Sequence, residues 1–282
     1  MLRSLISAIS GMQTFQERMD VIGNNIANSG TVGFKSSRAD FADTFNQSLR
    51  LATGGAAAVN GGQIGSGVAT DSIHNIFSQG ALSRTSLPTD MGIAGDGFFM
   101  VQDTATGTNY VTRAGDFRVD GTGYLVTNSG LRVQGYNDIA LTTVGDIKID
   151  LTGSGLPAGS ASVKAWAVSK DGKLSVSASD ALGTTFVRAQ ILLQNFLDPQ
   201  ALVKQGNNAY ANVPNAGPLF PVGKPPGQAG LGNLESGVLE NSNVDIANEF
   251  TSLITTQRGY QANAKIITAS DEMLQDALNL KR

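Results

Sequence analysis

The C-terminal stretch of the chain decides the fold. From Asn243 to Arg282 it reads NVDIANEFTSLITTQRGYQANAKIITASDEMLQDALNLKR. Apolar side chains recur there at alternating steps of four and three residues, and polar side chains fill only two steps, at Gln257 and Asp271. A strict seven-residue repeat lays one narrow apolar stripe along a helix, and such a stripe needs a partner helix. The apolar members are Ile246, Phe250, Leu253, Tyr260, Ala264, Ile267, Leu274 and Leu278.

Residues 1–30 carry a similar stripe at steps of three or four. Its members are Leu2, Leu5, Ile9, Met12, Phe15, Met19, Ile22 and Ile26. The two patterns predict helices over roughly residues 2–28 and 244–280. Asn28-Ser29-Gly30 provides a stop signal with candidates for a left-handed C-cap, and residues 241–243 offer N-caps for the second helix. We expect the two helices to pair with each other and with neighbouring copies of the chain.

The middle of the chain has the alternating period of β-strands from about residue 90 onward. Two runs end in turn sequences typical of hairpins, Asp120-Gly121-Thr122-Gly123 and Lys170-Asp171-Gly172-Lys173. Phe117 and Val119 are expected to face Tyr124 and Val126 across the first turn, and a last strand is expected near 186–193. The fold class is therefore α+β: paired N- and C-terminal coiled-coil helices form an inner layer, and a mainly antiparallel β body is inserted between them.

The connections between helices and β body are expected to be extended. Residues 51–70 are small and Gly-rich, and five of the chain's eight prolines lie within 214–226. Phe41, Phe45 and Leu49 fit one face of a short helix. The expected domains are a terminal helical assembly domain (1–30 with 243–282), an extended linker region (31–89 with 206–242) and a β body (90–205).

Composition excludes several classes of function. The 282-residue chain has a formal net charge of -3 and only 15% charged residues, so no surface for a polyanion such as nucleic acid is expected. It has no cysteine, which excludes disulfides and thiolate chemistry. The N-terminus does not have the pattern of a cleaved secretory signal, and no run of about 18 apolar residues predicts a membrane span.

No catalytic or metal-binding pattern emerges. The single histidine, His74, is accompanied by no nucleophile elbow or ligand spacing, and a structural or surface role is expected for it. The Gly-rich runs at 65–67 and 95–97 do not continue into a nucleotide-binding motif. We therefore expect no enzyme activity, no catalytic residues, no metal and no cofactor. An exported β-domain enzyme or adhesin on a coiled-coil stem is the alternative class, and the division of the heptads between both termini argues against it.

Several blocks of the sequence resemble the bacterial flagellar rod and hook protein family. They run in the family's order from near the first residue to near the last: 20–28 (DVIGNNIAN), 33–35 (GFK), 79–82 (QGAL), 93–99 (IAGDGFF), 112–117 (TRAGDF), 123–126 (GYLV), 237–245 (GVLENSNVD) and 257–263 (QRGYQAN). Within the family, residues 41–45, 135–137 and the ending at 278–282 resemble the hook type, whereas the length is closer to the distal rod type. For a hook protein, residues 140–185 would be a reduced middle part.

The resemblance implies a structural subunit of the bacterial flagellum, first of the hook and alternatively of the distal rod, located in the basal body or hook. Such subunits leave the cell through the flagellar type III export apparatus without a cleaved signal. They polymerise helically into a torque-transmitting tube, beside adjacent rod, hook-cap and hook–filament junction proteins. The predicted assembly interface comprises Leu5, Ile9, Met12, Met19, Ile22, Asn24, Asn25, Ile26, Asn28, Ile246, Phe250, Leu253, Gln257, Tyr260, Ile267, Leu274 and Leu278.

Four polar residues of this predicted interface region leave alternatives open. Asn24 and Asn28, beside Gly23, are either fraying polar residues at a helix end or donors to a neighbouring subunit. Gln257 and Asp271 either hydrogen-bond between subunits, face a central channel, or lie on the solvated edge of the seam.

Overall fold

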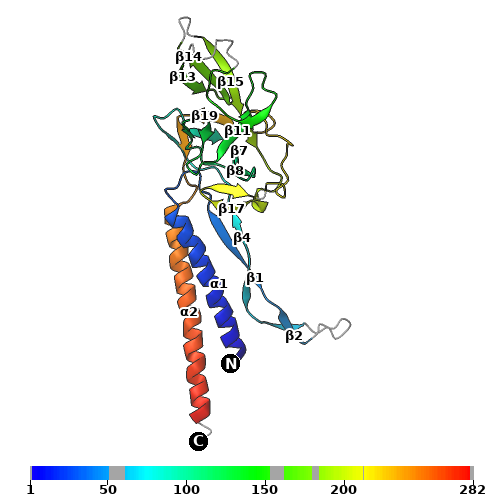
Figure 1. Cartoon of the computed structure of the whole chain (residues 1–282). Helices are drawn as coiled ribbons and strands as arrows, with labels where there is room; N and C mark the ends of the chain where they lie inside the picture. Colours follow the sequence, from blue (N-terminus) through cyan, green and yellow to red (C-terminus); the bar gives the residue numbers. More distant parts are fainter. Residues whose placement is uncertain (1, 51–60, 153–161, 180–183, 212, 280–282) are drawn as a thin grey trace. The chain divides into compact units, whose positions relative to one another are not determined.

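The computed structural model describes residues 2–50, 61–152, 162–179, 184–211 and 213–279. The chain divides into two compact units, which are drawn in sequence colours in Figure 1. The helical unit consists of Met1–Ser29, Ser36–Ile76 and Val244–Arg282, and the β unit consists of Gly30–Lys35 and Phe77–Asn243. The expected fold class is confirmed in its coarse form, because an N-terminal and a C-terminal helix flank a mainly antiparallel β body.

Two long helices form the helical unit. Helix α1 spans Leu2–Ala27 and α2 spans Ile246–Asn279, so they are about 39 and 51 Å long. They lie side by side (Figure 1). Neither helix, within its described residues, is apolar enough over a sufficient length to cross a membrane.

The ends of both helices differ from the predicted caps. The N-cap of α2 is Asp245, not a residue of 241–243, because its Oδ1 accepts the backbone N–H of Ala247 at 3.0 Å. Helix α1 stops as expected, and the N–H of Asn28 donates to the carbonyls of Asn24 and Asn25. No left-handed residue caps it at 28–30; the left-handed residue is Gly33, at φ 68°.

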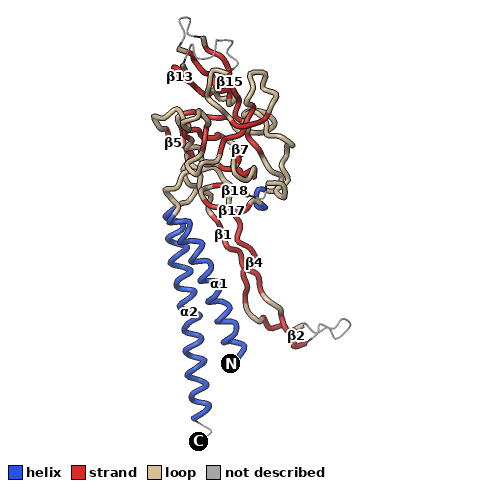
Figure 2. Tube along the Cα trace, in the orientation of Figure 1, coloured by secondary structure: helices blue, strands red, loops and turns tan. Residues whose placement is uncertain are grey.

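A two-stranded arm completes the helical unit. We use "arm" for β1 (Ser37–Asp43), β2 (Asn46–Arg50), β3 (Gly62–Gly65) and β4 (Val68–Asn75), in which β1 pairs with β4 and β2 with β3, both antiparallel (Figure 2). The short helix predicted from Phe41, Phe45 and Leu49 is therefore wrong: their spacing of four suits a helix, but the ladders to β4 and β3 take up the backbone hydrogen bonds. Residues 51–60 of the predicted loop lie outside the described residues.

The β unit is built on one large sheet, with twelve strands among its described residues. Its central order is β13-β14-β15-β11-β7-β8-β18-β17, and smaller two-stranded pairs β19–β6 and β20–β5 accompany it. The elements are β5 (Leu82–Arg84), β6 (Met91–Ala94), β7 (Phe98–Gln102), β8 (Asn109–Thr112), β9 (Arg118–Val119), β10 (Leu125–Val126), β11 (Arg132–Tyr136), β12 (Val144–Asp146), β13 (Val163–Val168), β14 (Lys173–Ala178), β15 (Thr185–Ile191), β16 (Leu193–Gln194), the 3₁₀ turn Pro199–Ala201, β17 (Val203–Gly206), β18 (Ala209–Ala211), β19 (Asn233–Ser236) and β20 (Val238–Glu240).

Both predicted hairpins of the β unit are confirmed. Val119 of β9 pairs with Leu125 of β10, one position away from the expected partner. Val168 of β13 pairs with Leu174 of β14 across the Asp171-Gly172 turn. The hydrophobic core of this unit includes Phe99, Phe117, Leu125, Val133, Ile147, Val176 and Ile191.

Candidate assembly site in the helical unit

Helices α1 and α2 approach closely because small residues lie where they meet. A Cβ atom added to Gly11 would lie 2.5 Å from Nδ2 of Asn263, and one added to Gly259 would lie 2.7 Å from the Phe15 ring. Small buried side chains of the pair include Ala8, Thr14, Thr256 and Ser270, and the larger Ile22 is buried as well. Small and polar residues therefore make up a large part of the described contact, whereas Phe250 and Leu278 of the predicted apolar seam stay exposed.

Asn25 fixes the N-terminal end of the arm to both helices. Its side chain is 1% exposed. Its Nδ2 donates to the Ser37 carbonyl at 2.8 Å and to Oε1 of Glu249 at 3.1 Å, and its Oδ1 accepts the Ser37 N–H at 2.9 Å. One amide therefore joins α1, β1 and α2. Sequence reasoning placed Asn25 at an interface between subunits, and these three hydrogen bonds of its side chain lie within one subunit.

The predicted interface residues fall into three groups by exposure. Ile22 and Asn25 are buried within the subunit. Partly exposed residues are Leu5, Met12, Met19, Ile26, Asn28, Leu253, Tyr260, Ile267 and Leu274. Exposed residues are Ile9, Asn24, Ile246, Phe250, Gln257 and Leu278. The exposed group is the part of the predicted set available to another copy of the chain.

The polar residues that left alternatives open have local partners or solvent. Asn28 donates to the carbonyl and the side-chain oxygen of Asn24, and nothing lies within 4 Å of a Cβ placed on Gly23. Gln257 is exposed, and Asp271 is exposed and accepts a bond from Gln275. Neither Gln257 nor Asp271 is buried between α1 and α2.

Exposed apolar side chains gather on α2 and on the arm. Ile246, Phe250 and Ile254 follow one face of α2 at steps of four and are about half exposed. On the arm, Phe45 is 94% exposed and Leu49 is 63% exposed. Sequence reasoning missed Ile254 and the arm residues, since it followed only the heptad positions. Such a concentration of apolar surface is typical of a site that binds another protein.

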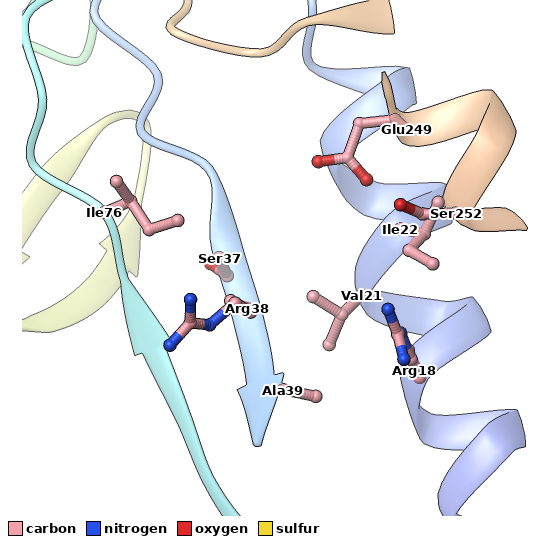
Figure 3. Close-up of a pocket in the computed structure, with 9 residues that line it drawn as sticks. All are labelled: Arg18, Val21, Ile22, Ser37, Arg38, Ala39, Ile76, Glu249 and Ser252. Carbon is pink, nitrogen blue, oxygen red and sulfur yellow. The ribbon is translucent and has the colours of Figure 1, made fainter. Parts of the chain in front are cut away.

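A small pocket lies within the helical unit between α1, α2 and the start of the arm (Figure 3). It measures about 150 Å³. Val21 and Ile22 of α1 and Ala39 and Ile76 beside the arm form its apolar wall. The polar groups that line it include Arg18, Arg38 and Glu249, so charge of both signs surrounds an apolar floor.

The pocket is too small for most ligands, and of its two arginine side chains one forms an ion pair. Small-molecule sites usually measure about 300–1,000 Å³. Arg38 forms an ion pair with Asp40 at 3.0 Å. Arg18 has no ion pair among the residues that the structure describes.

The β unit holds a buried charge cluster that sequence reasoning missed. Lys35 and Glu240 are 0% exposed and Arg113 is 4% exposed at their side chains. Glu240 contacts Lys35 Nζ at 2.7 Å and Arg113 at 3.3 Å, and it also accepts the Gly80 N–H at 2.8 Å. Lys35 Nζ donates to the Ser78 carbonyl at 2.7 Å. Burial lowers the pKa of Lys35 below its ordinary value, and the hydrogen bond and charge of Glu240 oppose that shift.

Comparisons with known proteins identify the family. Three family models match the chain: "Flagella basal body rod protein" over residues 5–35, "Flagellar hook protein FlgE/F/G D1 domain" over 92–177, and "Flagellar basal body rod FlgEFG protein C-terminal" over 235–280. The flagellar basal-body rod protein FlgG of Bacillus subtilis is 44% identical over 100% of both chains. The chain belongs to the flagellar rod and hook protein family. It is a structural protein of that family and not an enzyme.

Further relatives carry both rod and hook names. FlgG of Borreliella burgdorferi is 35% identical over 100% of both chains. The hook protein FlgE of the same organism is 28% identical over an alignment of 446 residues that covers 100% of both chains. A solved structure of the Helicobacter pylori hook protein FlgE2 is 15% identical, covers 65% of this chain and 47% of its own, and has a TM-score of 0.23, which is too low to support an argument.

The candidate for catalysis or metal binding that the sequence offered, His74, lies in the β1–β4 ladder. His74 on β4 lies opposite Arg38 of β1, and its Nδ1 is 3.2 Å from Asp40. Among the described residues no group of His, Asp and Glu side chains is arranged to hold a metal ion.

Proposed function

We propose that the chain is a subunit of the flagellar rod, of the distal rod type, which polymerises helically into a stiff shaft that transmits torque. The observation that carries the proposal is full-length similarity at 44% identity to a protein named for the basal-body rod. Alignment with the hook relative instead extends to 446 residues, well beyond the 282 of this chain. The hook type, favoured by the local sequence resemblance, is the second candidate.

The surfaces of the helical unit support a polymer. Ile246, Phe250 and Ile254 form an exposed apolar face on α2. Covering this face with another surface removes it from water and so stabilises the complex. A contact between two different surfaces of identical subunits can repeat without closing, which produces a filament. We infer that delivery to the growing tip occurs through the flagellar type III export apparatus, and that neighbouring rod, hook-cap and junction proteins border the polymer.

Electron microscopy of labelled basal bodies tests the assignment. A peptide tag is inserted in the exposed turn at Gly121, where nothing lies within 4 Å of an added Cβ, and gold-labelled antibody is applied to basal bodies isolated from the host bacterium. We expect gold along the rod. Gold along the hook would support the second candidate, and labelling of neither structure would contradict the proposed function.

A further inference from the structure

We propose that Phe45 of one copy inserts into the pocket beside Val21 of a second copy, and that Asp43 of the first copy then faces Arg18 of the second. This contact deepens the proposed function, because it names the residues of one subunit interface in the polymer. We call Asp43–Phe45 the knob. The occupant of the pocket is thus a second copy of this chain.

Exposure identifies the knob. Phe45 lies two residues after the end of β1 and is 94% exposed, although a buried phenylalanine is normally one of the larger sources of stability in a protein. Leu49 on β2 is also 63% exposed, so the outer part of the arm presents apolar side chains. A solvated aromatic ring at this position has no role in the fold of its own unit, since it packs against nothing there.

The pocket fits one large side chain better than a ligand or a helix. Its volume is about 150 Å³, the space of roughly five water molecules. The wall that a ring would touch is apolar and comes from Val21, Ile22, Ala39 and Ile76. In Figure 3, Val21 of α1 and Ala39 of β1 point toward each other across it.

Charge complements the apolar fit. Arg18 at the pocket and Asp43 of the knob each lack an ion pair among the described residues. Asp43 accepts a side-chain hydrogen bond from Asn46. An ion pair between an arginine and a carboxylate across the contact would give it orientation and discriminate against other apolar side chains.

Distance requires the second copy. Ala39 lines the pocket, and Phe45 follows it on the same extended chain after about 20 Å. Pairing of β1 with β4 holds this segment extended, so Phe45 cannot return to its own pocket without breaking that ladder. Knob and pocket are different surfaces of the same helical unit, so their contact can repeat from copy to copy without closing.

Disulfide crosslinking in assembled flagella tests the contact. The chain has no cysteine, so an Asp43→Cys/Arg18→Cys double variant carries the introduced pair alone and keeps Phe45. Mild oxidation of isolated basal bodies should give a ladder of dimers, trimers and larger species on a non-reducing gel. Each single variant should give no ladder. Assembled structures without crosslinks, or dimers only, would overturn the proposed repeating contact.

Two further sets of variants, a truncation with its control and a charge exchange, keep the test decisive if the double cysteine variant fails to assemble. Phe45→Ala should lower the affinity of each contact roughly ten- to hundredfold and reduce the number of assembled structures. Leu49→Ala on the same arm is the matched control and should have little effect. Asp43→Arg should impair assembly and Arg18→Asp should restore it in the double variant. Normal assembly by Phe45→Ala, or no restoration by the charge exchange, would refute the contact while gold labelling still tests the proposed function separately.

Discussion

Replacement of Lys35 by methionine should destabilise the β unit strongly. The substitution keeps the length of the side chain and removes a fully buried ammonium that contacts Glu240 at 2.7 Å. Among the described residues, the Glu240 side chain then keeps Arg113 at 3.3 Å and the Gly80 N–H, so a buried carboxylate loses its nearest countercharge. Removing one partner of a buried ion pair costs about 3–5 kcal/mol. For a unit of this size, that free energy corresponds to a fall in Tm of about 6–20 °C.

The single tryptophan provides the assay. Trp166 lies on β13 in the β unit, so its fluorescence during heating of the full-length chain reports the unfolding of that unit. The matched control is Lys148→Met in the same unit, because the Lys148–Asp150 pair is 35% and 22% exposed at its side chains and such partly solvated pairs contribute about 1 kcal/mol or less. If the Tm of Lys35→Met fell no further than that of Lys148→Met, the reasoning about the buried cluster would be refuted.

Three further changes test other parts of the structure. Phe250→Asp should abolish assembly while the monomer stays folded, because the Phe250 ring is already 48% exposed in the monomer. Circular dichroism checks the fold and electron microscopy checks the assembly. Gln261→Asp, at an exposed polar position of the same helix, is the control and should assemble normally. Asn25→Ala should destabilise the helical unit by about 1–3 kcal/mol, since it removes the hydrogen bonds of a buried amide to the Ser37 backbone and to Glu249. Urea unfolding followed by circular dichroism measures the change, and unchanged stability would contradict the role of this amide. Deletion of residues 1–29 and 244–282 should give a folded monomer that does not polymerise, which gel filtration would show. Retained assembly would contradict the association of subunits through their terminal helices.

The sequence was sufficient for the elements whose pattern is local. Heptad spacing predicted both terminal helices, and the Asp-Gly turns predicted both hairpins. The same spacing led to the wrong element at Phe41, Phe45 and Leu49, because steps of four also occur in strands whose outward side chains are free to be apolar.

Contacts between distant residues were beyond the reach of sequence patterns. The heptads did not reveal that the helices meet closely at Gly11 and Gly259, or that Phe250 is about half exposed. Lys35 and Glu240 belong to two of the sequence blocks that resemble the family, 33–35 and 237–245. No rule of spacing predicts a contact between residues so far apart in the chain. Asn25 was selected as an interface residue on the resemblance, and the hydrogen bonds that use it became visible only in three dimensions.

The Lys35–Glu240 pair also sets an order of events during folding. The two residues are separated by 205 positions in the chain. Closing a loop of that length costs about 5 kcal/mol in chain entropy before any contact offsets it, and non-local contacts of this kind slow folding. When a chain becomes available N-terminus first, Lys35 cannot contact Glu240 until almost the whole chain is available. The buried charge cluster of the β unit is therefore completed late, after the chain up to residue 240 is available.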